Sequence, residues 1–252
     1  MQRPDYDLSK IKFATDQPTF EKAVVLYESG KVTQFEEGIR SYAAVVLGTK
    51  PYRVSVEARR YDYGHCNCYL GQSDTLCKHM VALALFVVMY GKPLTDEDKK
   101  LIDSPSCSGK LGKLEKEELA VIKKSFTEAL RYIKGYNGPS RTWFAYQNSL
   151  QEGCKRLSAI VSNLPVNEQT TQLLVDLLLR LDKKLISGGV DDSDGTVGEF
   201  IRETVEVLIQ YTKLDPKCTP TFRQLENRET CFGWEKPLLE LISDKHDDII
   251  SP

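Results

Sequence analysis

Three cysteines and one histidine within fourteen residues constrain this chain more than any other feature of its sequence. They form two pairs, Cys66-x-Cys68 and Cys77-x-His79, with eight residues between the pairs. Structural zinc sites are tetrahedral and use four thiolate or imidazole ligands. The spacing therefore predicts a closed Zn²⁺ site whose ligands are Cys66, Cys68, Cys77 and His79.

Other interpretations of this cluster are weaker. Buried free thiols beside a surface histidine would leave the paired spacing unexplained. His65 could replace His79 as the fourth ligand, but it directly precedes Cys66 and would strain the site. A catalytic zinc ion keeps one coordination position open, whereas four ligands fill the shell here. The chain also carries no P-loop. We expect a structural metal site, no catalytic residues and no enzymatic activity.

The segments before the cluster have the periodicity of one helix and a hairpin. Apolar side chains recur at helical spacing within residues 16–30, which Asp16 can cap. Alternating patterns at residues 42–46 and 52–56, separated by a Gly/Pro turn, predict an antiparallel hairpin. Residues 32–35 can supply a third strand. The first fifteen residues are expected to form an extended arm.

The cluster leads directly into an apolar helix, predicted from about Leu76 to Tyr90 and ended by Gly91 and Pro93. Its apolar run is too short to cross a bilayer and is typical of a buried helix. No segment indicates a membrane protein. The seven cysteines, without an export signal, favour reduced thiols and a cytoplasmic location.

The remainder of the chain is predicted to be helical. A Ser/Gly/Lys-rich segment is interpreted as a linker (104–113), which separates an N-terminal zinc-binding domain (1–103) from a helical bundle domain (114–252). Apolar stripes indicate its main helices, and two shorter helices can follow them; the stripes lie within 119–133, 143–164, 173–185 and 196–213. The predicted fold class is therefore α+β.

Two further motifs lie in the helical half of the chain. The acidic run Asp191–Gly195 does not fit a calcium-binding loop, because Val190 and Ile201 stand where ligating acids are needed. Ser193 or Asp194 is instead expected to cap the following helix. The aromatic segment 231–237 is expected to join the core, and a docking edge is the alternative.

The pattern C-x-C, eight residues, C-x-H resembles the SWIM zinc finger over about residues 50–90. The resemblance implies a ββα zinc-finger module, in which a hairpin carries the cysteine pair and a helix begins at the histidine. More loosely, the whole chain is similar to uncharacterised bacterial proteins with an N-terminal SWIM finger and a helical remainder. SWIM fingers are associated with binding DNA or other proteins.

The sequence favours a non-enzymatic module that recognises another protein. The net charge of −2 gives no general attraction to nucleic acid, and no small-molecule substrate is indicated. The alternative is a DNA- or RNA-binding face on the hairpin, where basic residues alternate with tyrosines. Its tentative nucleic-acid contacts are Arg53, Arg59, Arg60 and Lys78.

Overall fold

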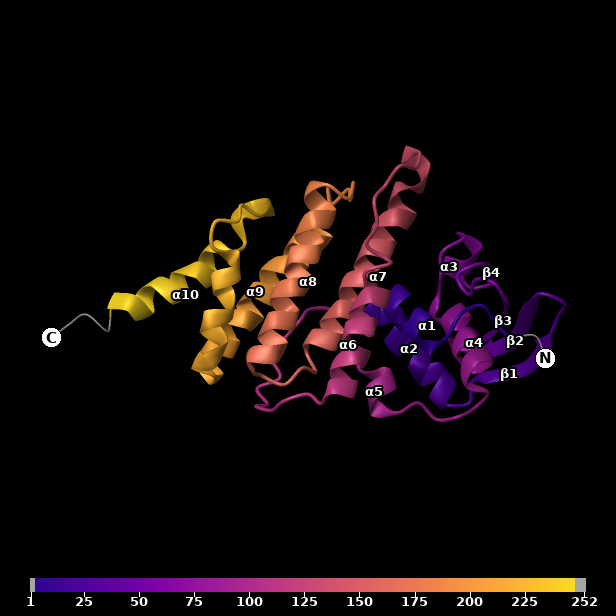
Figure 1. Cartoon of the computed structure of the whole chain (residues 1–252). Coiled ribbons are helices and arrows are strands. Elements are labelled where there is room, and N and C mark those ends of the chain that lie inside the picture. The colour runs from indigo at the N-terminus through magenta and orange to yellow at the C-terminus, as the bar shows by residue number, and fades with distance from the viewer. Residues whose placement is uncertain (1–2, 248–252) are drawn as a thin grey trace. The chain divides into compact units, whose positions relative to one another are not determined.

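The computed structural model describes residues 3–247 (Figure 1). The described residues form two compact units, with the boundary between Leu101 and Ile102. The first unit contains an antiparallel sheet and helices, and the second is helical. The predicted α+β class is confirmed. Each unit has its own cluster of buried apolar side chains.

Within residues 3–101, four strands form one antiparallel sheet in the order β1-β2-β3-β4. These strands are β1 (Val32–Glu37), β2 (Ser41–Leu47), β3 (Pro51–Glu57) and β4 (Gly64–Cys66). The predicted hairpin is β2–β3, in which Val45 pairs with Arg53, and β1 is the expected third strand. The fourth strand carries the first cysteine of the cluster.

The helices of the first unit are α1 (Leu8–Ala14), α2 (Gln17–Glu28), α3 (Tyr69–Gln72), α4 (Lys78–Met89) and α5 (Asp96–Lys99). Helix α2 begins as predicted, because the Asp16 carboxylate accepts a hydrogen bond of 2.9 Å from the Thr19 amide. Helix α4 ends one residue earlier than expected, at Met89, and Tyr90 takes the left-handed conformation that stops it.

The prediction of an extended arm over the first fifteen residues is wrong where the structure describes them. Helix α1 forms there because Asp7 caps it, with its carboxylate 2.7 Å from the Lys10 amide. Ile11 faces the core and is fully buried. A seven-residue helix with one buried side chain leaves little periodic signal in the sequence.

Helix α4 lies between the sheet and helix α2. Six successive side chains from Met80 to Leu85 are buried, so the helix has no solvent-facing stripe over this stretch. The sheet contributes Val46, Val54 and Val56 to the same core. This packing fixes the start of α4, where the second ligand pair lies.

The second unit contains α6 (Lys116–Ala129), α7 (Trp143–Val161), α8 (Glu168–Ile186), α9 (Thr196–Leu214) and α10 (Lys236–Asp247). Shorter 3₁₀ segments are η1 (Ser140–Thr142), η2 (Pro216–Leu225) and η3 (Cys231–Gly233). Leucine side chains of α7, α8 and α9 form the centre of its core, including Leu150, Leu157, Leu174, Leu178 and Leu208.

The Ser/Gly/Lys-rich segment 104–113, predicted as a linker, lies within the second unit and bonds to it. The Ser108 hydroxyl donates to the Leu164 carbonyl over 2.6 Å, and the Val166 amide donates to the Lys110 carbonyl over 2.7 Å. The segment therefore follows the surface of the helical unit.

The structure corrects the predicted cap of α9. The carboxylate of Asp192, rather than Ser193 or Asp194, accepts from two amides of the first turn, those of Val197 at 2.7 Å and Gly198 at 2.8 Å. The side chain of Asp194 reaches only the amide of Thr196, at 3.1 Å. The sequence could not show which of these three neighbouring side chains accepts from the amides of the first turn, because that depends on the path of the loop.

The aromatic segment 231–237 joins the core only in part. Trp234 is buried, and its indole donates to the Asp182 carboxylate over 3.1 Å. Phe232 has 75% of its surface exposed. Among the described residues, none of the helices is long and apolar enough to span a membrane.

Candidate metal centre

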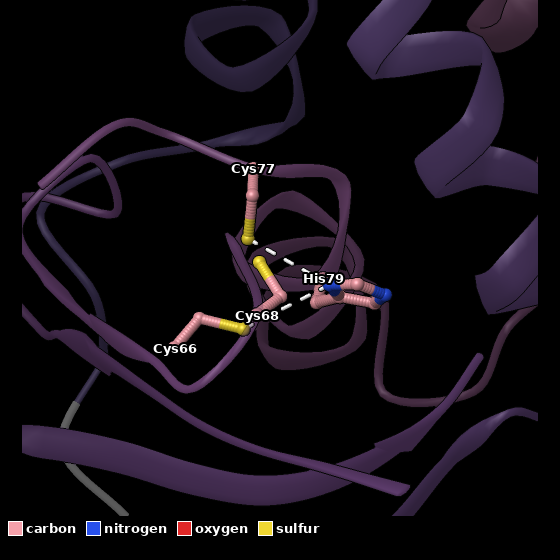
Figure 2. Close-up of side chains that lie close together, drawn as sticks. All are labelled: Cys66, Cys68, Cys77 and His79. Atoms are coloured by element: carbon pink, nitrogen blue, oxygen red, sulfur yellow. Dashed lines mark hydrogen bonds between the residues drawn. The ribbon is translucent and has the colours of Figure 1, made fainter. Parts of the chain in front are cut away.

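Three elements of the first unit, β4, α3 and α4, bring the cysteines and the histidine together. Cys66 ends β4, Cys68 precedes α3, and Cys77 and His79 stand at the start of α4 (Figure 2). The end of a strand and the cap of a short helix thus supply the first pair, and the cap and first turn of a buried helix supply the second. The side chains point toward one another although thirteen residues separate the first ligand from the last.

The geometry of the cluster fits a single metal ion. The three sulfur atoms and one histidine nitrogen all lie within 4.8 Å of one another, and all four side chains are buried. The Nδ1 atom of His79 is 3.8 Å from the Sγ atoms of both Cys66 and Cys77. His65 is exposed on β4 and lies outside this cluster. His79, rather than His65, therefore faces the thiols.

Close backbone packing holds the cysteine-bearing segments together. A Cβ atom on Gly71 would stand 2.2 Å from the Cys66 carbonyl oxygen, and one on Gly64 would stand 2.1 Å from the Ser55 carbonyl oxygen. Only glycine allows α3 to lie on β4, and β4 to lie on β3, at these distances. The Cys68 sulfur also accepts a hydrogen bond from the Gly71 amide at 3.4 Å.

Hydrogen bonds within the cluster shift the pKa values of the Cys66 and Cys77 thiols in opposite directions. The hydrogen bond from the Cys66 thiol, together with those from His79 and from the Met80 amide, lowers the pKa of Cys77. The pKa of Cys66 is raised, because this thiol shares its proton with Cys77 and is buried. A thiolate at Cys77 is the form that binds a metal ion.

The four residues proposed for nucleic-acid contact come from three places in the first unit. Arg53 is exposed on β3, Arg59 and Arg60 are exposed in the turn after it, and Lys78 is half-buried as the first residue of α4. Arg60 is paired with Asp62 at 2.7 Å, so its charge is partly neutralised. The structure does not concentrate all four charges in one element.

Sequence reasoning missed the contact of Tyr52 with the candidate site. The ring of Tyr52, on β3, stacks on the imidazole of His79 with their centroids 4.2 Å apart. The alternation of the strand indicated that Tyr52 and Val54 share a face. It gave no signal that this face reaches a histidine twenty-seven positions further along the chain.

Comparisons with protein-family models, with curated proteins and with solved structures gave no match to this chain. The candidate site is therefore interpreted from its own chemistry and geometry.

Proposed function

We propose that Cys66, Cys68, Cys77 and His79 bind one Zn²⁺ ion and that the first unit is a SWIM-type zinc finger. The observation that carries this proposal is the burial of all four ligand-type side chains around one point. Three thiolates and an imidazole suit zinc and fill its tetrahedral shell. With no open position, the ion would stabilise the fold without taking part in a reaction, by on the order of 10 kcal/mol.

Metal analysis of the purified chain tests the zinc site. We expect about one zinc ion per chain, and we expect its loss in Cys66→Ser. Cys107→Ser is the matched control, because Cys107 is a free cysteine of the helical unit and lies outside the cluster. Equal zinc content in Cys66→Ser and the wild type, or a different metal in the wild type, would contradict the assignment.

We further propose that the finger is a non-enzymatic recognition module in the cytoplasm whose partner is a protein. Two exposed apolar residues support this proposal: Tyr69 and Leu70 on α3 have 84% and 44% of their surface exposed. They lie between the two ligand pairs, so the metal would hold them in a fixed conformation. Aromatic side chains are enriched where proteins bind one another. All seven cysteines lie within the described residues and are free, which suits a reducing compartment.

Quantitative affinity capture from lysate tests the recognition surface. Partners that depend on the finger should be lost both with Cys66→Ser and with the double variant Tyr69→Ser/Leu70→Ser. Phe144→Ser is the matched control, since Phe144 is 75% exposed but belongs to the helical unit. Recovery of an unchanged set of proteins by both finger variants would count against a recognition role for this surface.

Nucleic-acid binding is the second candidate, because Arg53 and Arg59 are exposed in the hairpin region. Phosphate contacts release counterions, so binding should weaken steeply as salt increases. Arg59→Gln should weaken binding more than Arg60→Gln, which removes the same charge but from an ion pair with Asp62. An electrophoretic mobility titration at low salt that detects no complex would exclude this candidate.

A further inference from the structure

Within residues 3–247, the imidazole of His79 receives no hydrogen bond on the side away from the cysteines. Its Nδ1 atom faces the sulfur atoms of Cys66 and Cys77. The opposite nitrogen, Nε2, is buried and has no hydrogen-bond partner among the described residues. A histidine that binds a metal usually donates its second N–H to a carboxylate, carbonyl or water, which fixes the orientation of the ring. Some other contact must orient this ring.

Tyr52, at the start of β3, supplies such a contact. The ring of Tyr52 lies on the imidazole with an interplanar angle of 27° and a centroid distance of 4.2 Å. The hydroxyl of Tyr52 lies 2.9 Å from the Thr49 hydroxyl oxygen, in the turn that precedes the strand. The ammonium group of Lys50 lies 5.7 Å from the centre of the Tyr52 ring. Residues of the β2–β3 turn thus lie around the ring that stacks on the histidine.

Gly48 in the same turn leaves space for both rings. A Cβ atom at this position would stand 3.0 Å from His79 Nε2 and 2.9 Å from Cε2 of Tyr52. Real Cβ contacts are rarely this close, so an added methyl group would displace the imidazole or the phenol ring. The φ angle of Gly48 is not in the left-handed region. The requirement at this position is therefore for space and not for an unusual backbone torsion.

We propose that Tyr52 and Gly48 are positioning residues of the metal centre. Stacking by Tyr52 and the absence of a side chain at Gly48 keep Nδ1 of His79 directed at the three sulfur atoms, in place of the missing hydrogen bond. The inference rests on the proposed zinc site and extends it to residues with no metal-binding atom in the cluster. It also assigns a role to the β2–β3 turn, because Gly48 of this turn lies beside Nε2 of His79.

Four single-residue variants of the full chain test this proposal. Tyr52→Val removes the ring but keeps a side chain suited to a strand. Tyr52→Phe keeps the ring and loses only the hydroxyl, so it should retain the zinc affinity that Tyr52→Val loses. Gly48→Ala adds the crowding methyl group. Tyr63→Val is the control, because Tyr63 is 60% exposed and its ring lies beside Arg60, outside the cluster.

The measurements are the zinc dissociation constant, from competition with a chromophoric chelator, and the visible spectrum of the Co²⁺-loaded protein. Tyr52→Val and Gly48→Ala should each weaken zinc binding by about tenfold or more, the size usual for loss of an orienting contact. Their Co²⁺ bands should change in shape. Tyr52→Phe and Tyr63→Val should match the wild type in both measurements.

A purely structural role for Tyr52 would lower the stability of the metal-free and zinc-loaded protein equally and leave the dissociation constant unchanged. That result for Tyr52→Val would overturn the proposal, as would equal weakening by valine and phenylalanine. If Tyr52→Val does not fold, the zinc affinity of Gly48→Ala tests the proposal instead. Wild-type affinity in Gly48→Ala would overturn the role of the turn. A wild-type chain that binds no zinc would refute the metal site itself, whereas one zinc per wild-type chain with unaffected variants refutes only this inference.

Discussion

At the scale of single residues, Gly71 shows how little space surrounds the candidate metal centre. The Cβ atom of an alanine there would stand 2.2 Å from the carbonyl oxygen and 2.6 Å from the Cβ atom of Cys66. Neither atom is the end of a flexible side chain, so α3 or β4 would have to move. Exchanging glycine for alanine within a helix normally gains up to about 1 kcal/mol. Here the clash should outweigh that gain.

We therefore predict that Gly71→Ala weakens zinc binding by at least about tenfold, because it displaces a ligand-bearing strand. Competition titration against a chelator measures the effect. Gly112→Ala is the control, since its added Cβ atom would lie 3.5 Å from Pro165, an ordinary contact in the helical unit. Equal affinities in Gly71→Ala and the wild type would show that α3 can shift without disturbing Cys66.

At the scale of elements, α5 is a four-residue helix held by its capping box. The Thr95 amide and hydroxyl donate to the Asp98 carboxylate at 2.9 and 2.8 Å, and the Asp98 amide donates back to the Thr95 hydroxyl at 3.1 Å. The two bonds to the carboxylate, first that of the amide, lower the pKa of Asp98. Electrostatics thus support an element too short to form by helix propensity alone.

The lowered pKa fixes the sign of the pH dependence. Because the folded state favours the carboxylate, Asp98 contributes its stability fully above the ordinary carboxyl pKa of about 4. That contribution is lost as the pH falls through the lower pKa of the folded state. We predict that Thr95→Val, which removes the hydroxyl donor and keeps the amide, raises the pKa of Asp98 toward its ordinary value.

Carboxyl-detected NMR titration measures this change. Thr33→Val is a suitable control in the same unit. It makes the same substitution, but the hydroxyl of Thr33 donates to the backbone carbonyl of Val45 and not to Asp98. An unchanged pKa of Asp98 in Thr95→Val would mean that the Thr95 hydroxyl does not contribute to the acidity of this carboxyl group.

At the scale of the whole molecule, the two units have separate cores, and tryptophan fluorescence reports on only one of them. Both tryptophans, Trp143 and Trp234, lie in the unit that begins at Ile102. The four candidate metal ligands lie in the unit that ends at Leu101. Tryptophan fluorescence should therefore report the unfolding of the helical unit without a direct signal from the metal centre.

We predict that a strong chelator destabilises the first unit alone. Removing a structural zinc ion withdraws binding energy on the order of 10 kcal/mol from the residues that hold it. Amide hydrogen exchange should accelerate in β3, β4 and the first turn of α4, while the thermal transition followed by tryptophan fluorescence stays at the same temperature. Chelator treatment of Cys66→Ser, which already lacks the ion, should change neither measurement. A shift of the tryptophan transition on zinc removal would show that the two units are energetically coupled.

Local patterns in the sequence predicted the features that depend on neighbouring residues. The β2–β3 hairpin followed from alternation and a Gly/Pro turn, and α2 followed from its cap and its apolar spacing. The paired spacing of the cysteines and His79 predicted a group of side chains able to hold one metal ion. Each of these signals arises within one strand, one helical turn or one short loop.

Only the tertiary structure decided the contacts between distant segments. It placed Tyr52 on His79, chose Asp192 over its neighbours as the cap of α9, and buried Ile11 deeply enough for α1 to form. These outcomes depend on packing between segments far apart in the chain or on the path of a loop, and neither has a fixed period. The sequence determined which side chains could bind a metal ion, whereas packing determined how they are oriented and what surrounds them.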